Sequence, residues 1–471
     1  MARKDRVVQP RSIGVSSLRK GNFYTVASVE LGNTTTKCIL VTTNLETAEI
    51  FEIDKEIRLT RDVRSPKPDE SVFGRTIFGV DLTRESVSEM ITDVLNAVVK
   101  RARLDMERDL HFVVRSTGVT AGFATPSEVG TIVQALADGC LKAGVPPRKM
   151  TASLSIENLP PGLQDFSWLK KVYFDGAVAS SLPPSDTDIV ANEMEGELVT
   201  AGIKGAAKST DIDFRNPVMT LDFGTTLAGR VTDNSYPYAK TIGSFAGLAG
   251  AISDSLVRRT GLVPEQNGSV LDITHSGRLK HVEVDDSWIS EAEQMIRVEQ
   301  VSKEETRFGT VPVNGKSAEE AGVLLVGVDV GTNGSQLGEL EDVGKRIFDE
   351  VGLEALLTVI DHIQADIVQR ILSIVDSEGL ILENTSLGLT GRSIITGEKP
   401  RLIVENLRLG SGELWSSSHD IIFVEDGLAM GAAVAARCMN SMGTTQNPMG
   451  GRKGDRCIMA ERLKLQKKGR G

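Results

Sequence analysis

The feature that most constrains this sequence is a short apolar run that ends in an aspartate, a glycine and two threonines. Within residues 217–233, PVMTLDFGTTLAGRVTD, Asp222 ends the first apolar run, and Gly224, Thr225 and Thr226 precede a second run. This order predicts a β-hairpin with a tight polar tip. The glycine lets backbone N–H groups approach an anion, the threonines add hydroxyl donors, and the aspartate is a suitable Mg²⁺ ligand.

The same pattern occurs about 190 residues earlier in the chain. Residues 26–41, VASVELGNTTTKCILV, again predict a strand, a polar tip and a return strand, with Glu30 in the place of the aspartate. Taken alone, either hairpin is also compatible with an ordinary polar turn. Two such hairpins in this order predict a duplicated α/β unit with a nucleotide held between its halves.

Composition limits the possible partners. The chain has 471 residues, of which 40% are hydrophobic and 25% charged, as in soluble globular proteins. Its net charge of −11 argues against nucleic acid as the main ligand. The sequence contains no apolar run of membrane length and no signal-type apolar segment, so we expect a cytoplasmic protein without membrane contact. The four cysteines and five histidines show no metal-ligand spacing.

Both ends of the chain are basic, against the acidic balance of the rest. The charges predict a solvated N-terminal tail over residues 1–22 and a solvated C-terminal tail over residues 446–471. A docking site for an acidic partner or RNA is the alternative for either tail.

Hydrophobic periodicity and capping signals predict the elements of the first half. Thr83 is the expected N-cap of a long helix, and the capping box of residues 125–128 opens another that runs to about residue 143. Strands are expected over residues 23–30, 37–42, 47–59, 110–115 and 150–156, followed by a surface excursion over residues 160–188.

The second half is predicted in the same way. An acidic helix from residue 189 to Gly202 or Gly205 precedes the Asp222 hairpin, and the glycines of residues 243–250 mark a loop that enters a helix. The turn of residues 329–334 is either a third turn at the site or a plain strand-to-helix junction, which we favour. The remaining expectations are a strand pair over 272–284, helices over 286–301, 353–375 and 426–442, and strands over 386–390 and 421–424.

This order of motifs resembles the actin, heat-shock-70 and sugar-kinase superfamily of ATPases, and specifically its activase branch. From the opening ASVELGNTTTKCIL to the closing VEDGLAMGAAVAARCMNSMG, the chain is similar to the methanogenesis marker protein 14 family. The resemblance implies two ribonuclease H-like domains with mixed five-stranded sheets flanked by helices, and a nucleotide cleft between the halves. We place the halves at residues 23–205 and 206–445, with an inserted subdomain at about 265–320 in the second.

The resemblance also implies ATP or ADP with Mg²⁺ as the ligand. Asp222 and Glu30 would hold the metal, Asp222 would take part in catalysis, and Glu193 or Glu197 of the acidic helix would orient water. The residues expected to contact the nucleotide are Glu30, Gly32, Asn33, Thr34, Thr35, Lys37, Gly224, Thr225, Thr226, Gly247, Gly250, Gly391, Arg392 and Ser393.

By the same resemblance, the expected function is ATP-dependent activation or reactivation of a methanogenic metalloenzyme. The protein client in the methane-forming pathway would be methyl-coenzyme M reductase or a corrinoid methyltransferase. The superfamily normally begins its first hairpin with aspartate; the longer Glu30 predicts slow ATP hydrolysis or binding alone. A non-catalytic scaffold and a small-molecule kinase are the alternatives, and the sequence leaves a homodimer open.

Overall fold

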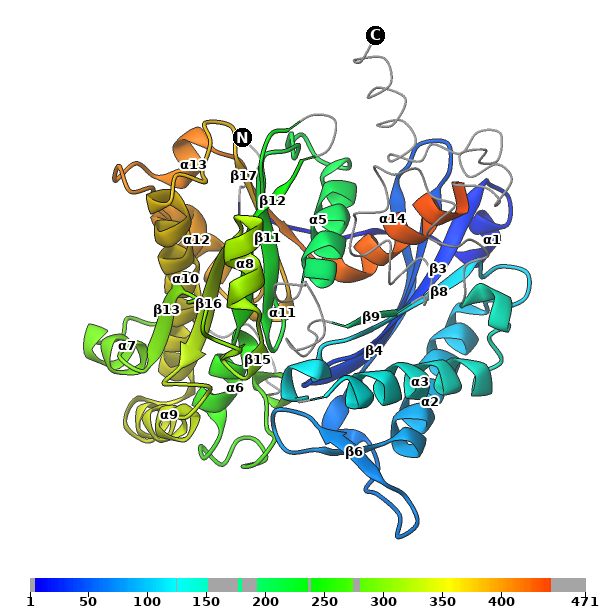
Figure 1. Ribbon diagram of the computed structural model, residues 1–471, viewed down its shortest axis with the longest axis horizontal. Helices are drawn as coiled ribbons and strands as arrows, with labels where there is room; N and C mark the ends of the chain where they lie inside the picture. Colours follow the sequence, from blue (N-terminus) through cyan, green and yellow to red (C-terminus); the bar gives the residue numbers. More distant parts are fainter. Residues whose placement is uncertain are drawn as a thin grey trace.

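The computed structural model describes residues 5–123, 125–150, 177–179, 193–235, 239–273 and 280–441. These residues form a mixed α/β protein in which two large sheets stand on either side of a pair of helices (Figure 1). Two small hairpins lie outside the large sheets: β6 (Val72–Arg75) with β7 (Asp81–Thr83), and β14 (Arg307–Phe308) with β15 (Val311–Pro312).

The first sheet has six strands in the order β2-β5-β4-β3-β8-β9. Strands β3, β4 and β5 are antiparallel neighbours, and β8 and β9 continue the sheet in parallel. The strands are β2 (Arg11–Ser12), β3 (Phe23–Leu31), β4 (Thr35–Asn44), β5 (Ile50–Leu59), β8 (Phe112–Thr117) and β9 (Ala177–Ala179).

The second sheet has eight strands in the order β1-β18-β17-β10-β11-β12-β16-β13. Strands β10 and β11 form the antiparallel hairpin predicted around Asp222. The strands are β1 (Val7–Val8), β10 (Val218–Phe223), β11 (Leu227–Thr232), β12 (Thr241–Gly247), β13 (Ile296–Gln300), β16 (Leu324–Val330), β17 (Ser386–Thr390) and β18 (Ile421–Val424).

Five neighbouring strands in each sheet share one arrangement. The order β5-β4-β3-β8-β9 in the first sheet corresponds to β12-β11-β10-β17-β18 in the second, with two antiparallel pairings followed by two parallel ones. The predicted number of five strands per sheet is nevertheless wrong. Strand β2 extends the first sheet, while β1, β16 and β13 extend the second. These strands add to the outer edges that the five-stranded arrangement leaves open.

Helices cover the sheets on their outer sides and fill the space between them (Figure 1). α2 (Arg84–Ala102) and α3 (Pro126–Lys142) pack on the first sheet. The predicted N-cap Thr83 and the predicted capping box at Thr125 are confirmed, and Thr83 also forms a capping box, with Ser86. The second sheet packs against α6 (Gly250–Val257), α9 (Leu337–Val351) and α10 (Leu353–Ser377). The remaining helices of the second half are α7 (Asp286–Glu293), α8 (Gly315–Ala321), α11 (Arg392–Ile395), α12 (Lys399–Asn406) and α13 (Trp415–Ser418).

Two helices occupy the middle of the molecule between the sheets: α5 (Glu193–Ala207) and α14 (Gly427–Ser441). Their buried side chains join those of both sheets in one core cluster. The backbones approach closely because small residues face each other: a Cβ atom at Gly202 would lie 1.8 Å from the carbonyl oxygen of Gly427, and one at Gly431 would lie 1.9 Å from that of Leu198. This contact fixes the distance between the halves.

The described part of the N-terminal segment is not the solvated tail that its charges predict. β1 pairs with β18 in the second sheet, whereas β2, two residues further on, pairs with β5 in the first. Val15 and Leu18 of the short helix α1 (Val15–Leu18) are buried. The basic side chains have acidic partners elsewhere in the chain: Arg11 lies 3.3 Å from Glu49, and Arg19 lies 2.7 Å from Asp109. The charges within one stretch of sequence do not show such partners, because these lie far away in the chain. We call residues 7–12 the N-terminal strap.

Several smaller predictions are also corrected. The stretch predicted as a strand pair at 272–284 has no strand among its described residues, and only the first part of 286–301 is helical, because Ile296–Gln300 pairs with β16. The turn at 329–334 is a strand-to-helix junction, as favoured. The strand predicted over 150–156 lies outside the described residues beyond Met150, and Ala177–Ala179 within the expected surface excursion form β9. The C-terminal tail also lies outside them.

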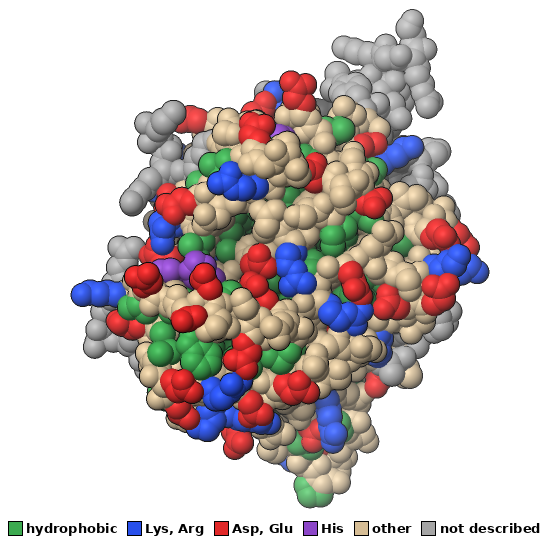
Figure 2. Space-filling model, turned by 90° about the vertical axis from the view of Figure 1, so that its left-hand side faces the viewer, with side chains coloured by type: hydrophobic (Ala, Val, Ile, Leu, Met, Phe, Trp, Pro, Cys, Tyr) green, Lys and Arg blue, Asp and Glu red, His purple; other side chains and the backbone are tan. Residues whose placement is uncertain are grey.

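The surface agrees with the mixed composition. Figure 2 shows acidic and basic side chains interspersed, with only small apolar patches between them, over the face on the left of Figure 1. Within the described ranges, no helix combines the length and the apolar character that a membrane span requires.

The contact between α5 and α14 gives a stability prediction. Gly202→Ala should destabilise the protein by at least about 2 kcal/mol, because the added methyl group meets backbone that is held by a second helix. Gly130→Ala, in α3, is the matched control: a Cβ atom there meets nothing within 4 Å, so this change should stabilise by about 0.5 kcal/mol. Urea unfolding of both variants measures the difference. Equal effects would contradict the proposed role of the contact.

Candidate functional site

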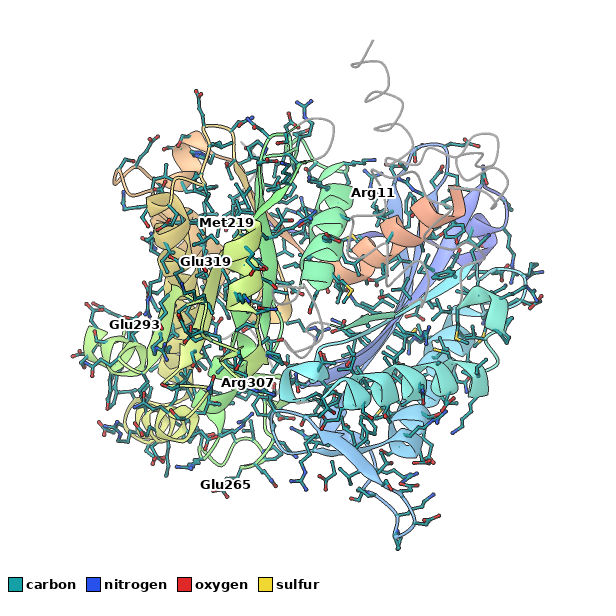
Figure 3. The ribbon with its side chains drawn as sticks, viewed as in Figure 1. Arg11, Met219, Glu265, Glu293, Arg307 and Glu319 are labelled. Atoms are coloured by element: carbon teal, nitrogen blue, oxygen red, sulfur yellow. The ribbon has the colours of Figure 1, made fainter. Side chains whose placement is uncertain are left out.

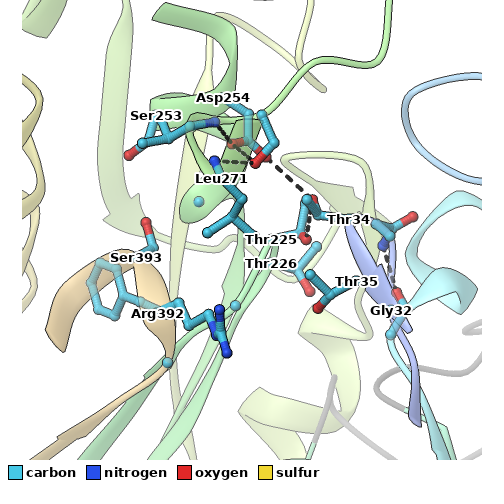
Figure 4. A pocket seen from close by; sticks show the side chains of 18 of the residues that line it. Gly32, Thr34, Thr35, Thr225, Thr226, Ser253, Asp254, Leu271, Arg392 and Ser393 are labelled. Carbon is cyan, nitrogen blue, oxygen red and sulfur yellow. Dashed lines mark hydrogen bonds between the residues drawn. The ribbon is translucent and has the colours of Figure 1, made fainter. Parts of the chain in front are cut away.

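A pocket open to solvent lies between the two sheets, and the tips of both predicted hairpins line it; the space within its borders, including solvent, is about 950 Å³. Gly32, Thr34 and Thr35 come from the tip between β3 and β4, and Thr225 and Thr226 come from the tip between β10 and β11. The hydroxyl oxygens of Thr34 and Thr225 are 2.9 Å apart and hydrogen-bonded across the boundary (Figure 4). Two sequence segments about 190 residues apart therefore meet at one point.

The first hairpin tip is held by Thr60, the residue directly after β5. The Thr60 amide donates to the Thr34 carbonyl at 2.8 Å, and its hydroxyl donates to the Gly32 carbonyl at 2.7 Å. Asn33, a predicted nucleotide contact, does border the pocket. Its side-chain amide, however, donates to the Gly118 carbonyl at 2.8 Å and its side-chain oxygen accepts from the Ile77 amide at 3.0 Å. The Asn33 side chain thus ties the tip to its own half.

The second tip rests on the start of α6. The Gly250 amide donates to the Gly224 carbonyl at 2.8 Å, and the amides of Ala249 and Ala251 donate to the Thr225 carbonyl at 3.1 Å. These are N–H groups that the sequence predicted to be free for a phosphate; the structure gives them to the hairpin instead. Gly250 lines the pocket, but Gly247 ends β12 outside it, where a Cβ atom would lie 2.0 Å from the Val328 carbonyl oxygen.

The floor of the pocket carries more negative than positive charge. Glu30 and Lys37 face each other across β3 and β4, with their charged atoms 3.0 Å apart. Asp222 and Glu195 line the pocket beside them. Burial raises the pKa of Asp222 to about 7; Lys37 opposes the shift, and Glu30 and Asp426 add to it. Burial, with the charges of Asp222 and Glu30, raises the pKa of Glu195 well above its usual value.

Behind this floor, Lys55 of β5 joins the two halves. Its ammonium nitrogen lies 2.8 Å from a carboxylate oxygen of Asp426 and 2.9 Å from one of Glu425, at the start of α14. Glu52 of the first half is a third partner at 3.3 Å. These ion pairs raise the pKa of Lys55 despite the opposing effect of burial. The ammonium therefore compensates part of the negative charge of Asp426 next to the floor.

The far end of the pocket is formed by the turn after β17. Gly391 has φ +93°, and a Cβ atom there would lie 2.6 Å from a carboxylate oxygen of Asp222, so this turn requires glycine. Arg392 is exposed, and its guanidinium makes no ion pair with any described residue. Lys399, by contrast, is paired with buried Asp361 at 2.5 Å. Arg392 is thus a cation available to a ligand.

Thirteen of the fourteen predicted nucleotide contacts line the pocket, together with Asp222; Gly247 does not. Glu197 lies elsewhere, 3.7 Å from Arg230, and the side chain of Glu193 is outside the described residues. The structure instead brings Glu195 into the pocket. Three glutamates at alternate positions of one helix cannot share a face, and the acidic pattern alone did not show which one points inward. Asp254, Ser253 and Ser269 were also missed, since only the fold brings them near the tips.

The residues fit a magnesium ion that a ligand brings with it rather than a metal held by the protein alone. Among the described residues, no group of three or more His, Cys, Asp or Glu side chains is arranged to hold a metal ion. Mg²⁺ commonly takes one or two carboxylates together with phosphates and water. Asp222 meets this need. Glu30 is already paired with Lys37, which makes it the weaker metal ligand of the two.

Two buried oxygens of the pocket make no hydrogen bond to any described residue: Oε2 of Glu195 and Oγ of Ser393. They belong to different elements of the lining, α5 and α11. Buried polar atoms are normally satisfied, so both are candidates for contact with water or a ligand. The turn at 329–334, all of which is described, contributes no lining residue.

Comparison with known proteins identifies an archaeal family. Residues 23–466 match the model of a family described as an uncharacterized protein conserved in archaea (DUF2114). The chain is 49% identical over 458 residues to protein MJ1451 of Methanocaldococcus jannaschii, covering 97% of this chain and 94% of that one. It is 50% identical over 457 residues to a protein of Methanothermobacter thermautotrophicus, covering 96% of this chain and 84% of that one.

Solved structures show only distant likeness. A reductive activator for a corrinoid, iron–sulfur protein has 10% identity and a TM-score of 0.33, over 95% of this chain and 63% of that one. A Ppx/GppA family member from Aquifex aeolicus has 10% identity and a TM-score of 0.26, over 50% of this chain and 54% of that one. At these scores the likeness carries no statement about function.

The raised pKa of Asp222 gives a pH-dependent stability prediction. Between about pH 4 and pH 7 the folded state keeps a proton that the unfolded state has released, so stability falls as pH rises through this window and then levels off. Asn cannot ionise, so Asp222→Asn should be more stable than the wild type by about 1–3 kcal/mol at pH 8 and equal to it near pH 4.

Chemical denaturation across this pH range measures the difference. Asp420→Asn, which replaces an exposed aspartate outside this pocket, is the control. A gain in Asp222→Asn that is the same at pH 4 and pH 8 would contradict the assigned cause.

Proposed function

The chain belongs to the archaeal DUF2114 family, and we propose that it binds a magnesium–ATP or magnesium–ADP complex between two ribonuclease H-like halves of the actin-like ATPase type. One observation carries the proposal: two Gly/Thr hairpin tips, each from a five-stranded unit of the same strand order, meet with hydroxyls 2.9 Å apart over a pocket that contains Asp222. Tips of this composition suit phosphate oxygens, which accept hydrogen bonds from amides and hydroxyls.

The roles follow from position in the pocket. The hydroxyls of Thr34, Thr35, Thr225 and Thr226 would donate to the phosphates from both sides. Arg392, exposed and without an ionic partner among the described residues, would contact the base or a phosphate from the far end. A bound Mg²⁺ held through Asp222 would neutralise charge on the phosphates.

The acidic floor makes this binding dependent on the metal. Glu30, Asp222 and Glu195 together outnumber Lys37, so the floor repels a nucleotide without its cation when Asp222 and Glu195 are ionised. Burial is the main cause of the raised pKa values of Asp222 and Glu195, and the neighbouring carboxylates add to both shifts. Entry of a divalent cation favours their ionised forms, so binding near pH 6 should release protons.

Glu195 replaces Glu193 and Glu197 as the residue proposed to orient water. It lines the pocket from α5 with a buried oxygen that has no partner among the described residues. Positioning of water and neutralisation of charge are the main needs of phosphoryl transfer. Because Glu30 is a longer side chain paired with Lys37, we expect turnover to be slow.

The protein client of this function is also proposed. The two relatives come from Methanocaldococcus jannaschii and Methanothermobacter thermautotrophicus, which suits a role in the methane-forming pathway. We propose an activator or reactivase of a metalloenzyme there, such as methyl-coenzyme M reductase or a corrinoid methyltransferase. Closure of the halves around the nucleotide would change the surface offered to this partner.

One observation favours a scaffold as the second candidate. The tip hydroxyls are already bonded to each other, so the halves are held together without a ligand. Stimulation of ATP turnover by a protein partner supports the activator, stimulation by a small molecule supports a kinase, and binding without turnover supports the scaffold.

The binding proposal predicts calorimetric titrations. Mg·ATP and Mg·ADP should bind the wild type in the micromolar range, and binding should be lost with EDTA. Asp222→Asn should weaken it on the order of 100-fold, or ~2.7 kcal/mol, while keeping or raising stability. Asp420→Asn is the matched control on an exposed site. No binding by the wild type, or normal binding by Asp222→Asn, would overturn the proposal.

The assignment of Glu195 predicts a separation of binding from turnover. Glu195→Gln should lower single-turnover ATP hydrolysis by about 10²- to 10⁴-fold with little change in Mg·ATP affinity, because the carboxylate acts on water rather than on the nucleotide. Glu197→Gln is the comparison, because Glu197 lies on the same helix but outside the pocket, beside Arg230. If only Glu197→Gln loses turnover, the assignment made from the sequence is right and this one is wrong.

A further inference from the structure

The mouth of the pocket is bordered by a short segment of the second half that we call the rim segment, residues 267–272. Ser269, Val270 and Leu271 of this segment line the pocket, and Leu271 is 41% exposed, so it lies where the pocket meets solvent. Its last residues form a 3₁₀ turn, Val270–Asp272, which Asp272 caps by accepting from the Ser269 amide at 2.8 Å.

On its own half, the rim segment is attached through Asp254 of α6. One carboxylate oxygen accepts from the Ser269 hydroxyl at 2.7 Å and from the Val270 amide at 3.0 Å. The other oxygen accepts from the Thr34 hydroxyl of the first half at 3.2 Å (Figure 4). Asp254 therefore links the rim segment to the hairpin tips.

The rim segment is also attached to the opposite half through Arg61. The Arg61 guanidinium forms a two-point ion pair with the Asp272 carboxylate and donates to the Asn267 carbonyl at 3.2 Å. Both charged side chains are largely buried, with exposed fractions of 18% and 11%. A planar guanidinium held at two points against a carboxylate is one of the stronger and more directional ion pairs.

Arg61 is connected to the site as well as to the rim. It lies in the turn Thr60–Asp62, and Thr60 of this turn supports the first tip through the carbonyls of Gly32 and Thr34. Two neighbouring contacts also join the halves but involve no ion pair: Arg258 stacks over the Phe78 ring at 3.8 Å, and Arg307 donates to the Phe123 carbonyl at 2.6 Å (Figure 3).

We propose that the Arg61–Asp272 ion pair is a latch that closes the rim segment over the pocket mouth, so that a ligand passes the rim when this pair breaks. The ion pair joins the two halves at the mouth of the pocket. Water can solvate both charged side chains once the rim segment lifts, so the latch is reversible. The identity of the ligand rests on the function proposed above; the latch itself does not.

Hydrogen exchange of the ligand-free protein tests the latch directly. In Arg61→Met, the amides of Val270 and Leu271 should exchange about tenfold faster than in the wild type, which corresponds to ~1.4 kcal/mol of lost protection. Arg75→Met is the matched control, because it breaks an ion pair with Asp81 inside the β6–β7 hairpin, away from the mouth. Arg61→Lys, which keeps the positive charge and leaves the Asp272 cap in place, should restore part of the slow exchange. Unchanged exchange in Arg61→Met overturns the latch.

Ligand kinetics test the gating role. With a fluorescent Mg·ADP analogue in stopped flow, Arg61→Met should raise the association and dissociation rates by similar factors and leave Kd within about twofold, because a gate changes the barrier for both directions. Faster exchange with unchanged ligand rates overturns the gating role. If no nucleotide binds to any variant, the function proposed above fails, and the exchange result alone decides whether the latch exists.

Discussion

The rest of the structure depends on the close contact between α5 and α14. A methyl group at Gly202 or Gly431 would overlap the backbone of the facing helix, so the two helices can lie side by side only with glycine at these positions. The pair fills the space between the sheets and shares one core with both of them. Because α5 carries Glu195 and the turn before α14 carries Asp426, the same contact also decides which charges meet at the pocket floor.

The pocket floor illustrates how a binding site can lower the stability of the folded protein when no ligand is bound. Three carboxylates lie around one lysine in a buried place, and the protein accommodates them by holding protons that exposed carboxylates would release. Lys55, behind the floor, offsets the charge of Asp426 without entering the pocket. A bound cation would offset the charge of the ionised carboxylates, which is why we propose a metal-bound anion rather than a bare one as the ligand.

The sequence predicted what depends on neighbouring residues. Both hairpins, the N-cap at Thr83, the capping box at Thr125 and the turn at Gly391 follow from short patterns, and the structure contains all of them. Features that depend on residues far apart in the sequence were missed. Nothing near Val7 indicates that residue 423 is its neighbour, nothing in the spacing of the acidic helix selects Glu195, and the fit of Gly247 against Val328 becomes visible only when β12 and β16 pair.

The N-terminal strap has a consequence for the order in which the molecule is assembled. The outer edge of the second sheet is completed by Val7 and Val8, which precede every other described strand in the sequence, yet their partners in β18 are made more than 400 residues later. Strand β2 finds its neighbour β5 about 40 residues on. The first sheet can therefore form during synthesis, but β1 must wait, unpaired, until β18 has been made. Pairing of the N-terminal strap with both sheets thus marks the point at which β18 has taken its place in the second sheet.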